Sequence, residues 1–270
     1  MNTKSLKKQT KITRLIMNIP STPSFSLNGK IALVTGASKG IGRASALALA
    51  AQGAHVICVS RGQKALDEVC AEIQSMGQSA ESLVADMSSI QDINEKIANL
   101  PKVDILVNNA GTNIPEPFVE VSEQNFDHLV QLNIKGCFFV AQHVAAIMIK
   151  NKQGGSIINM SSQMGHIGAA NRTVYCLTKH SIEGLTKAMA VELAPQGIRV
   201  NSICPTFIKT PMTESFFDSE QFQTETLTKI PLGYVGEVED IMGVVIYLAS
   251  SASRLVTGSS HKVDGGWTAQ

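Results

Sequence analysis

From Lys30 onward, short runs of apolar and β-branched residues alternate with longer stretches of helical periodicity. The apolar runs are Ile31–Thr35, His55–Ser60, Ser82–Ala85, Val103–Asn108, Ser156–Met160, Arg199–Ile203 and Leu255–Val263. The expected helices include Ile41–Gln52, Gln63–Met76, Glu123–Lys150, Thr173–Ala194 and Val238–Ala249. Near-continuous apolar strands alternating with helices are typical of a parallel sheet covered on both faces. Because crossovers between parallel strands are right-handed, the pattern predicts a doubly wound α/β fold of the Rossmann type.

No linker interrupts this alternation, so residues 30–270 are predicted to form one domain, a normal size for such a fold. Residues 1–29 differ, since they carry five basic residues and no acidic one. We interpret residues 1–29 as a flexible basic extension, of which 18–29 reads as a linker. The alternatives are a transit peptide or a later start at Met17. No apolar core of a secretory signal is present in this stretch.

Composition restricts the possible partners. The formal net charge is +1, so no overall field attracts the chain to nucleic acid or to an acidic membrane surface. No uninterrupted apolar stretch reaches the length of a membrane span. The five cysteines are scattered and never form a CxxC pair, which is typical of free thiols in a reducing compartment. We therefore expect a cytoplasmic protein that binds neither nucleic acid nor membranes.

A glycine-rich turn follows the first expected strand. Thr35 leads into Gly36-Ala-Ser-Lys-Gly40-Ile-Gly42, and a helical pattern comes next. Glycines at such a turn let the backbone approach a pyrophosphate, and the helix N-terminus supplies N–H groups. The spacing differs from the common G-x-G-x-x-G, and a plain βα turn is the alternative. The expected cofactor contacts here are Gly36, Ser38, Lys39, Gly40, Ile41 and Gly42.

The end of the second strand bears on the choice of cofactor. NAD-preferring folds place an acidic residue there to bind the ribose 2′-hydroxyl, whereas an arginine accommodates a 2′-phosphate. This chain has Ser60 and Arg61 at that point, and Lys39 adds a positive charge in the glycine turn. The pattern favours NADP, with NAD as the alternative and Arg61 then an ordinary solvated charge.

Tyr175 and Lys179 are spaced to share one face of a helix. A tyrosine phenol normally ionises only near pH 10, and a neighbouring ammonium favours the phenolate. Such a pair suits proton transfer to or from an alcohol oxygen, although the spacing also occurs by chance. Ser162 lies thirteen residues before Tyr175, just past an expected strand, where its hydroxyl would face the ligand crevice. The spacing favours Ser162 over Ser161.

Further motifs accompany this set. They are Asp86, Asn108-Asn-Ala-Gly111, Asn133 within Leu-Asn-Ile-Lys-Gly, Pro205-Thr-Phe-Ile-Lys-Thr210 and the closing Asp264-Gly-Gly266. With Thr35–Gly42, Ser162 and the Tyr175-x-x-x-Lys179 motif, they make the chain resemble the short-chain dehydrogenase/reductase family from about Leu27 to the C-terminus. The resemblance implies a homotetramer and hydride transfer to or from a nicotinamide cofactor. No metal-ligand spacing is visible in the sequence, and such a hydride transfer needs no metal ion.

The resemblance also implies residue roles. Tyr175 would be the general acid or base, Lys179 would assist it and hold the nicotinamide ribose, Ser162 would bind the substrate oxygen, and Asn133 would hold a water. The remaining cofactor contacts would be Asp86, Met87, Asn108, Ala110, Gly111, Tyr175, Lys179, Pro205, Ile208 and Thr210. The family usually has Pro-Gly at Pro205-Thr206, and threonine takes a positive φ only at a cost, so we expect an altered loop shape there.

The substrate is expected to be polyhydroxylated. Asn113, Gln163 and His166 are polar residues expected near the site, although a loop histidine without such a role is an equal alternative for His166. Unpaired polar groups would penalise an apolar ligand. Residues 212–232 are expected to form a substrate lid. We therefore expect a sugar, sugar-acid or polyol oxidoreductase. A 3-oxoacyl thioester reductase is one alternative, and a non-catalytic NADP-binding sensor is another.

Overall fold

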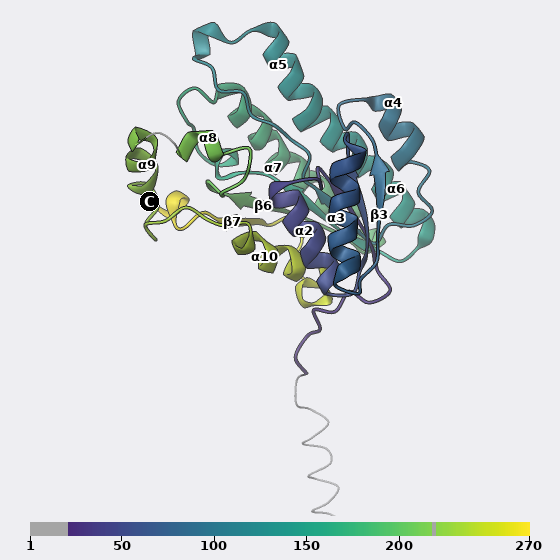
Figure 1. Ribbon diagram of the computed structural model, residues 1–270. Coiled ribbons are helices and arrows are strands. Elements are labelled where there is room, and N and C mark those ends of the chain that lie inside the picture. Colours follow the sequence, from purple (N-terminus) through teal and green to yellow (C-terminus); the bar gives the residue numbers. More distant parts are fainter. Residues whose placement is uncertain (1–20, 218–219) are drawn as a thin grey trace, which may run out of the picture.

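The computed structural model describes residues 21–217 and 220–270 (Figure 1). Its centre is a seven-stranded sheet in the order β3-β2-β1-β4-β5-β6-β7, with every neighbouring pair parallel. The strands are β1 Ile31–Thr35, β2 His55–Ser60, β3 Ala80–Val84, β4 Ile105–Asn108, β5 Gly155–Met160, β6 Ile198–Pro205 and β7 Ser260–Val263. The predicted doubly wound fold is confirmed. The strand order reverses between β1 and β4, and in such sheets ligands bind there, beyond the carboxyl ends of the strands.

Helices cover both faces of the sheet. The first face is packed by α2 Gly40–Ala51, α3 Gln63–Ser75 and α10 Glu239–Ala249. The second is packed mainly by α6 Cys137–Asn151, with contributions from α7 Thr173–Leu193. Alternation along the strands divides the core, since Val34 packs on the first face and Leu33 on the second. The short helices are α4 Ile90–Asp92, α8 Glu214–Phe217, α9 Glu220–Leu227 and the 3-10 turns Phe118–Glu120, Gln163–Gly165, Ala194–Gln196, Ser251–Ser253 and Trp267–Ala269.

The long helix expected at Glu123–Lys150 forms, but it is not uniform. It consists of α5 Glu123–Val130, a π-helical segment Gln131–Gly136 and α6. Glycine is required at Gly136, because a Cβ there would lie 2.0 Å from the carbonyl oxygen of Met87. A second π-helical segment spans Ile93–Ile97. The continuous helix Glu123–Asn151 is long and apolar enough to cross a membrane, but half of its most apolar window is buried within the protein, as in a core helix.

Several expected boundaries shift by one or two residues, and two shift further. The last strand begins at Ser260 and not at Leu255, because a turn through Gly258 (φ 71°) precedes it. At the other end, Leu27 is buried in the core, and its N–H donates to the Gln52 carbonyl at 2.8 Å. The packed part of the chain therefore begins before Lys30. Residues 1–20 of the expected basic extension lie outside the described residues.

Candidate active site

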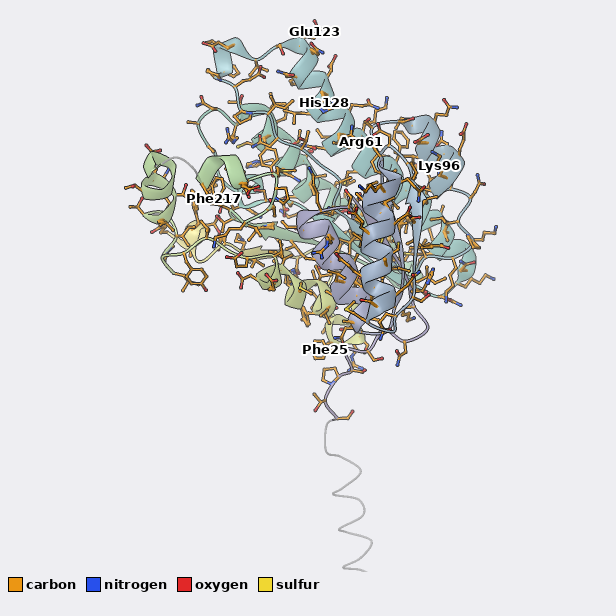
Figure 2. All side chains as sticks on the ribbon, in the orientation of Figure 1. Phe25, Arg61, Lys96, Glu123, His128 and Phe217 are labelled. Carbon is orange, nitrogen blue, oxygen red and sulfur yellow. The ribbon has the colours of Figure 1, made fainter. Side chains whose placement is uncertain are left out.

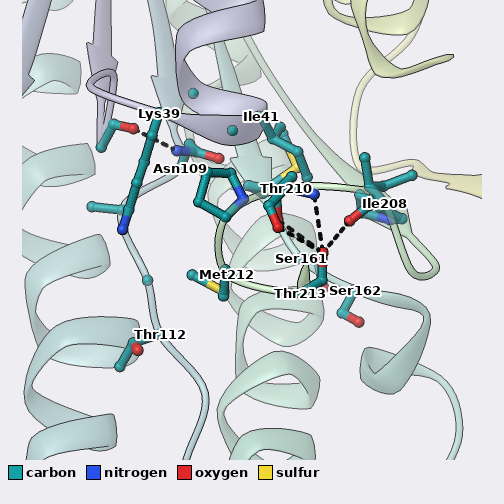
Figure 3. A pocket seen from close by; sticks show the side chains of 18 of the residues that line it. Lys39, Ile41, Asn109, Thr112, Ser161, Ser162, Ile208, Thr210, Met212 and Thr213 are labelled. Atoms are coloured by element: carbon teal, nitrogen blue, oxygen red, sulfur yellow. Dashed lines mark hydrogen bonds between the residues drawn. The ribbon is translucent and has the colours of Figure 1, made fainter. Parts of the chain in front are cut away.

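A cleft opens at the carboxyl ends of β1, β4, β5 and β6 (Figure 3). It holds about 880 Å³ of space between the atoms, part of it open to solvent. Its lining is Gly36, Lys39, Gly40, Ile41, Gly42, Asn109, Ala110, Gly111, Thr112, Met160, Ser161, Ser162, Tyr175, Lys179, Pro205, Thr206, Ile208, Thr210, Pro211, Met212 and Thr213. The crevice thus lies at the switch point where the topology predicts a ligand.

The glycine turn forms one wall of the cleft. Gly36 and Gly40 have φ of 66° and 56°, which favour glycine. A Cβ on Gly42 would lie 2.1 Å from the carbonyl oxygen of Gly36, so the turn closes only without a side chain there. Helix α2 begins at this turn, and the side chain of its N-cap residue, Lys39, makes no capping hydrogen bond. The first N–H groups of α2 are therefore available to an anion such as a pyrophosphate. These features fit a dinucleotide.

The end of β4 joins the glycine turn through Asn109. Its side-chain Nδ2 donates to the Thr35 carbonyl at 3.0 Å, and its N–H donates to Thr35 Oγ1 at 2.9 Å. Asn108, which the sequence placed among the cofactor contacts, is instead buried and donates to the Cys137 carbonyl at 2.8 Å. It holds β4 to the long helix and does not line the cleft. The polar residue at the cleft is Asn109. Neighbouring residues in a strand point to opposite faces, and this alternation could have shown that only one of the two asparagines faces the cleft.

Several expected cofactor residues lie beside the cleft and not in its lining. Ser60 ends β2, and the exposed Arg61 follows it (Figure 2). This end of β2 lies next to the glycine turn, because the N–H of Ala37 donates to the Val59 carbonyl at 3.0 Å. Asp86 follows β3, and its carboxylate accepts hydrogen bonds from the N–H and hydroxyl of Ser88. Ser38 and Met87 also lie outside the lining. These residues flank the end of the cleft nearest β2 and β3, where an adenosine half would extend.

The four expected catalytic residues converge. Tyr175 and Lys179 lie on α7, with Lys179 Nζ 5.5 Å from the tyrosine ring centroid and donating to the Met160 carbonyl at 2.8 Å. Ser162 follows β5 and lines the same cleft. Asn133 lies behind it in the π-helical segment, where its amide bonds to both the N–H and the carbonyl of Thr112 at 2.9 and 2.8 Å. The hydroxyl, phenol and ammonium therefore share one crevice.

A second cavity adjoins the first at Ser162 and Tyr175. It is lined by Asn113, Ser162, Gln163, Met164, Arg172, Tyr175, Thr206, Phe207, Met212 and Thr213. Asn113 Oδ1, Gln163 Oε1 and Thr206 Oγ1 are buried, yet none has a hydrogen-bond partner among the described residues. Buried polar atoms are normally paired, so these three need a partner from elsewhere.

Thr206 and Arg172 were not expected in the substrate cavity. The altered loop shape expected at Thr206 rested on a positive φ, but among the described residues only Lys152 and Asn171 combine a side chain with a positive φ. Thr206 therefore carries no left-handed strain, and its N–H donates to the Val263 carbonyl at 3.1 Å. Burial lowers the pKa of the Arg172 guanidinium, which remains a cation at neutral pH.

His166 does not line either cavity. Its Nε2 lies 3.4 Å from Cys204 Sγ and 3.5 Å from Glu183 Oε2, and neither of these partners lines the two cavities. The structure does not bring the His166 ring to the substrate cavity, because the ring is turned toward these two buried partners. In the expected lid, Met212 and Thr213 line both cavities. Residues 218–219 of that segment lie outside the described residues.

A doubly wound sheet whose switch point carries a glycine turn and a serine–tyrosine–lysine set defines a nucleotide-dependent oxidoreductase. The chain matches the family described as enoyl-(acyl carrier protein) reductase over residues 36–268. It belongs to the short-chain dehydrogenase/reductase family.

Relatives with established names cover nearly the whole chain. The chain is 40% identical to L-xylulose reductase of Mesocricetus auratus, over 90% of this chain and 98% of that one. It is 38% identical to the 3-oxoacyl-(acyl-carrier-protein) reductase of Thermotoga maritima, over 89% and 98%. Among solved structures, gluconate 5-dehydrogenase of Burkholderia cenocepacia, in complex with NADP and tartrate, aligns with a TM-score of 0.87, at 32% identity and over 91% and 98%.

Proposed function

We propose that this protein is an NADP(H)-dependent oxidoreductase that interconverts a secondary alcohol and a ketone on a sugar, sugar acid or polyol. The observation that carries the substrate class is the set of three unpartnered polar atoms in the second cavity, from Asn113, Gln163 and Thr206. A ligand with several hydroxyl groups would satisfy all three. An apolar ligand would leave them unpaired, at about 1–3 kcal/mol each.

The bound nicotinamide cofactor supplies or accepts the hydride. Within the protein, Tyr175 delivers the proton to the carbonyl oxygen in reduction and removes it in oxidation. The Ser162 hydroxyl holds that oxygen, since it lines both cavities where they meet. The Lys179 ammonium lies 5.5 Å from the Tyr175 ring centroid and donates to the Met160 carbonyl, which holds its positive charge beside the phenol. Asn133 fixes the backbone of Thr112 at the wall of the cleft. We also assign to Asn133 the water that connects Lys179 to solvent.

NADP is the proposed cofactor because positive charge gathers where the 2′-phosphate would lie. Lys39 lines the cleft, and Arg61 stands at the end of β2 in place of the acid that NAD-specific folds carry. The NADP complex of the structurally similar gluconate 5-dehydrogenase supports this choice.

Arg172 refines the substrate class. Its guanidinium lines the second cavity, and arginine is the side chain best suited to a carboxylate. A sugar acid would place its carboxylate there while its hydroxyls reach Asn113, Gln163 and Thr206. The polar lining disfavours the acyl chain of a 3-oxoacyl thioester, although one relative reduces such substrates by name. The full serine, tyrosine and lysine set also disfavours a non-catalytic sensor, which needs no proton transfer.

A homotetramer is proposed from the outer surface of the long helices. Phe126, Phe138, Leu177 and Val191 are large apolar residues exposed on α5, α6 and α7. Exposed apolar patches on such helices mark protein interfaces. The five free cysteines support a cytoplasmic location, where thiols stay reduced. Light scattering of the purified protein tests the assembly.

The function is tested with NADPH and NADH against ketosugars, keto sugar acids and a 3-oxoacyl thioester. We expect NADPH-dependent reduction of a polyhydroxylated ketone, and no turnover in Tyr175→Phe, which should still bind NADPH. Faster reduction of the 3-oxoacyl thioester than of every sugar would overturn the substrate class. Turnover retained in Tyr175→Phe would overturn the catalytic assignment.

A further inference from the structure

A second polar cluster lies beside Ser161, whose side chain bonds to both Glu183 and Cys204. It consists of His166, which follows the turn Gln163–Gly165, of Glu183 on α7 and of Cys204 on β6. Cys204 Sγ lies 3.4 Å from His166 Nε2 and 3.3 Å from Glu183 Oε1, and His166 Nε2 lies 3.5 Å from Glu183 Oε2. Three elements that are distant in sequence therefore present an imidazole, a carboxylate and a thiol to one point. The proposed oxidoreductase chemistry uses none of these groups.

The cluster holds a buried negative charge. Glu183 is 5% exposed, and its Oε2 accepts hydrogen bonds from Ser202 and Ser260. Burial opposes its ionisation, but these hydrogen bonds, with those of Ser161 and Cys204, hold the pKa of Glu183 below its usual range. A buried carboxylate that stays ionised is stabilised by a nearby cation.

No full cation fills that role. In the part of the chain that the structure describes, the ion-pair contact of Glu183 is to His166. Burial lowers the pKa of His166, and the charges of Lys262, His180 and Lys187 lower it further, although Glu183 acts in the opposite direction. A neutral imidazole binds metal ions through a ring nitrogen, and in His166 the nitrogen that faces Glu183 and Cys204 is Nε2.

The spacing of the three groups matches a tetrahedral site. With metal–sulfur bonds of about 2.3 Å and metal–nitrogen or metal–oxygen bonds of about 2.0–2.2 Å, tetrahedral ligands lie roughly 3.3–3.6 Å apart. The two contacts of Cys204 Sγ, 3.4 Å to His166 Nε2 and 3.3 Å to Glu183 Oε1, fall in this range, and Nε2 lies 3.5 Å from the other carboxylate oxygen, Oε2. One ligand atom from each residue lies within 4.8 Å of the other two, so a small rotation of the carboxylate would bring a single oxygen to the ion. His166 keeps 23% of its side chain exposed, which leaves a route for an ion and a position for a water as fourth ligand.

We propose that His166, Glu183 and Cys204 bind a divalent cation of the zinc class, separate from the catalytic cleft. The mixed sulfur, nitrogen and oxygen donors favour zinc over magnesium or calcium, which prefer oxygen ligands. Binding forms a metal–thiolate bond and releases the Cys204 proton to solvent. Because binding displaces this proton, affinity should increase with pH.

Cobalt(II) tests the site, because it reports its own ligands. Untagged full-length protein, reduced and freed of metal by a chelator, is titrated with Co²⁺. We expect one ion per chain, with a thiolate-to-cobalt charge-transfer band in the near ultraviolet and the intense visible absorption of tetrahedral cobalt. Zinc should abolish both signals by competition and should raise the melting temperature.

Three variants and one control complete the experiment. Cys204→Ser should lose the charge-transfer band, and Glu183→Gln and His166→Ala should each bind at least about tenfold more weakly. Cys70→Ser is the control, since Cys70 is also buried but lies on α3, away from the cluster. If Cys204→Ser does not fold, the partly exposed His166→Ala carries the test. A missing charge-transfer band in the wild type would show that the cluster is a hydrogen-bond network only, and a band that persists in Cys204→Ser would show that another thiolate binds the cobalt. Either result would overturn the proposal.

Discussion

Replacing Thr206 with valine should yield a protein that is more stable but catalytically poorer. The side-chain Oγ1 of Thr206 is buried in the wall of the second cavity and has no hydrogen-bond partner among the described residues. Valine has nearly the same shape and carries a methyl group in place of the hydroxyl. The change therefore removes an unsatisfied polar atom from the free enzyme and a hydrogen-bond partner from the substrate complex.

The two effects have opposite signs and separate magnitudes. A buried hydroxyl without a partner costs about 1–3 kcal/mol in mutational data, so the variant should gain about 1 kcal/mol of stability. For a domain of this size, that gain raises the melting temperature by about 2–4 °C. A neutral hydrogen bond contributes about 0.5–1.5 kcal/mol, so kcat/KM for the sugar substrate should fall by roughly 2- to 13-fold.

Thr186→Val is the matched control. Thr186 is buried on α7, and its hydroxyl accepts a hydrogen bond from Asn159 Nδ2 at 3.0 Å. Its loss leaves that amide unpaired, so this variant should lose about 1–3 kcal/mol of stability. Thermal unfolding and steady-state kinetics on both variants complete the comparison. The reasoning fails if Thr206→Val is destabilised as much as Thr186→Val, or if it retains wild-type kcat/KM.

Three further predictions follow from the site and its flanks. Arg61→Ala should weaken NADPH binding by about tenfold, which corresponds to about 1.4 kcal/mol, and leave NADH binding unchanged in a fluorescence titration; equal losses for both would refute the 2′-phosphate assignment. Gly42→Ala should lose NADPH binding and about 1–3 kcal/mol of stability, because its Cβ would lie 2.1 Å from the Gly36 carbonyl oxygen. Unchanged titration and unfolding curves would show that the turn has room for a side chain. Burial raises the pKa of Asp264, but the hydrogen bonds from Thr268 and Gly266 lower it by more, so the pKa lies below the ordinary value of 3.8. The stabilisation by Asp264 is thus present above about pH 4 and is lost as the pH falls through the lower pKa of the folded state. The difference in melting temperature between the wild type and Asp264→Asn should therefore disappear on acidification. A difference that does not change with pH would count against this.

Most of the fold could be predicted from the hydrophobic pattern alone. Each expected strand and helix is present, because buried parallel strands leave a continuous apolar signal that local sequence shows directly. The misplaced start of the last strand has a local cause, since Leu255 and Val256 are apolar but precede the turn at Gly258. The π-helical segment within the long helix left no such signal. It depends on the close approach of Gly136 to Met87, a contact between residues far apart in sequence.

The site divides in the same way. Motif spacing was enough to bring Ser162, Tyr175 and Lys179 together, because strand ends and helix turns fix those positions. Motif spacing could not predict that Asn108 points away from the cleft while Asn109 faces it, or that His166 points to Cys204. No metal-ligand spacing was visible either, since the proposed ligands come from three elements. Side-chain direction in loops depends on tertiary partners, which local pattern does not encode.

Strand β6 links the proposed metal site to the substrate. Ser202 and Cys204 lie two residues apart and both face Glu183 on α7, and Thr206, two residues further, lines the substrate cavity. The glycine turn that would hold the pyrophosphate lies instead at the end of β1. Zinc at the cluster should therefore change KM for the sugar more than the affinity for NADPH, measured with and without zinc. The change should vanish in His166→Ala. An equal effect on both ligands would mean that the cluster acts on the whole domain and not through β6.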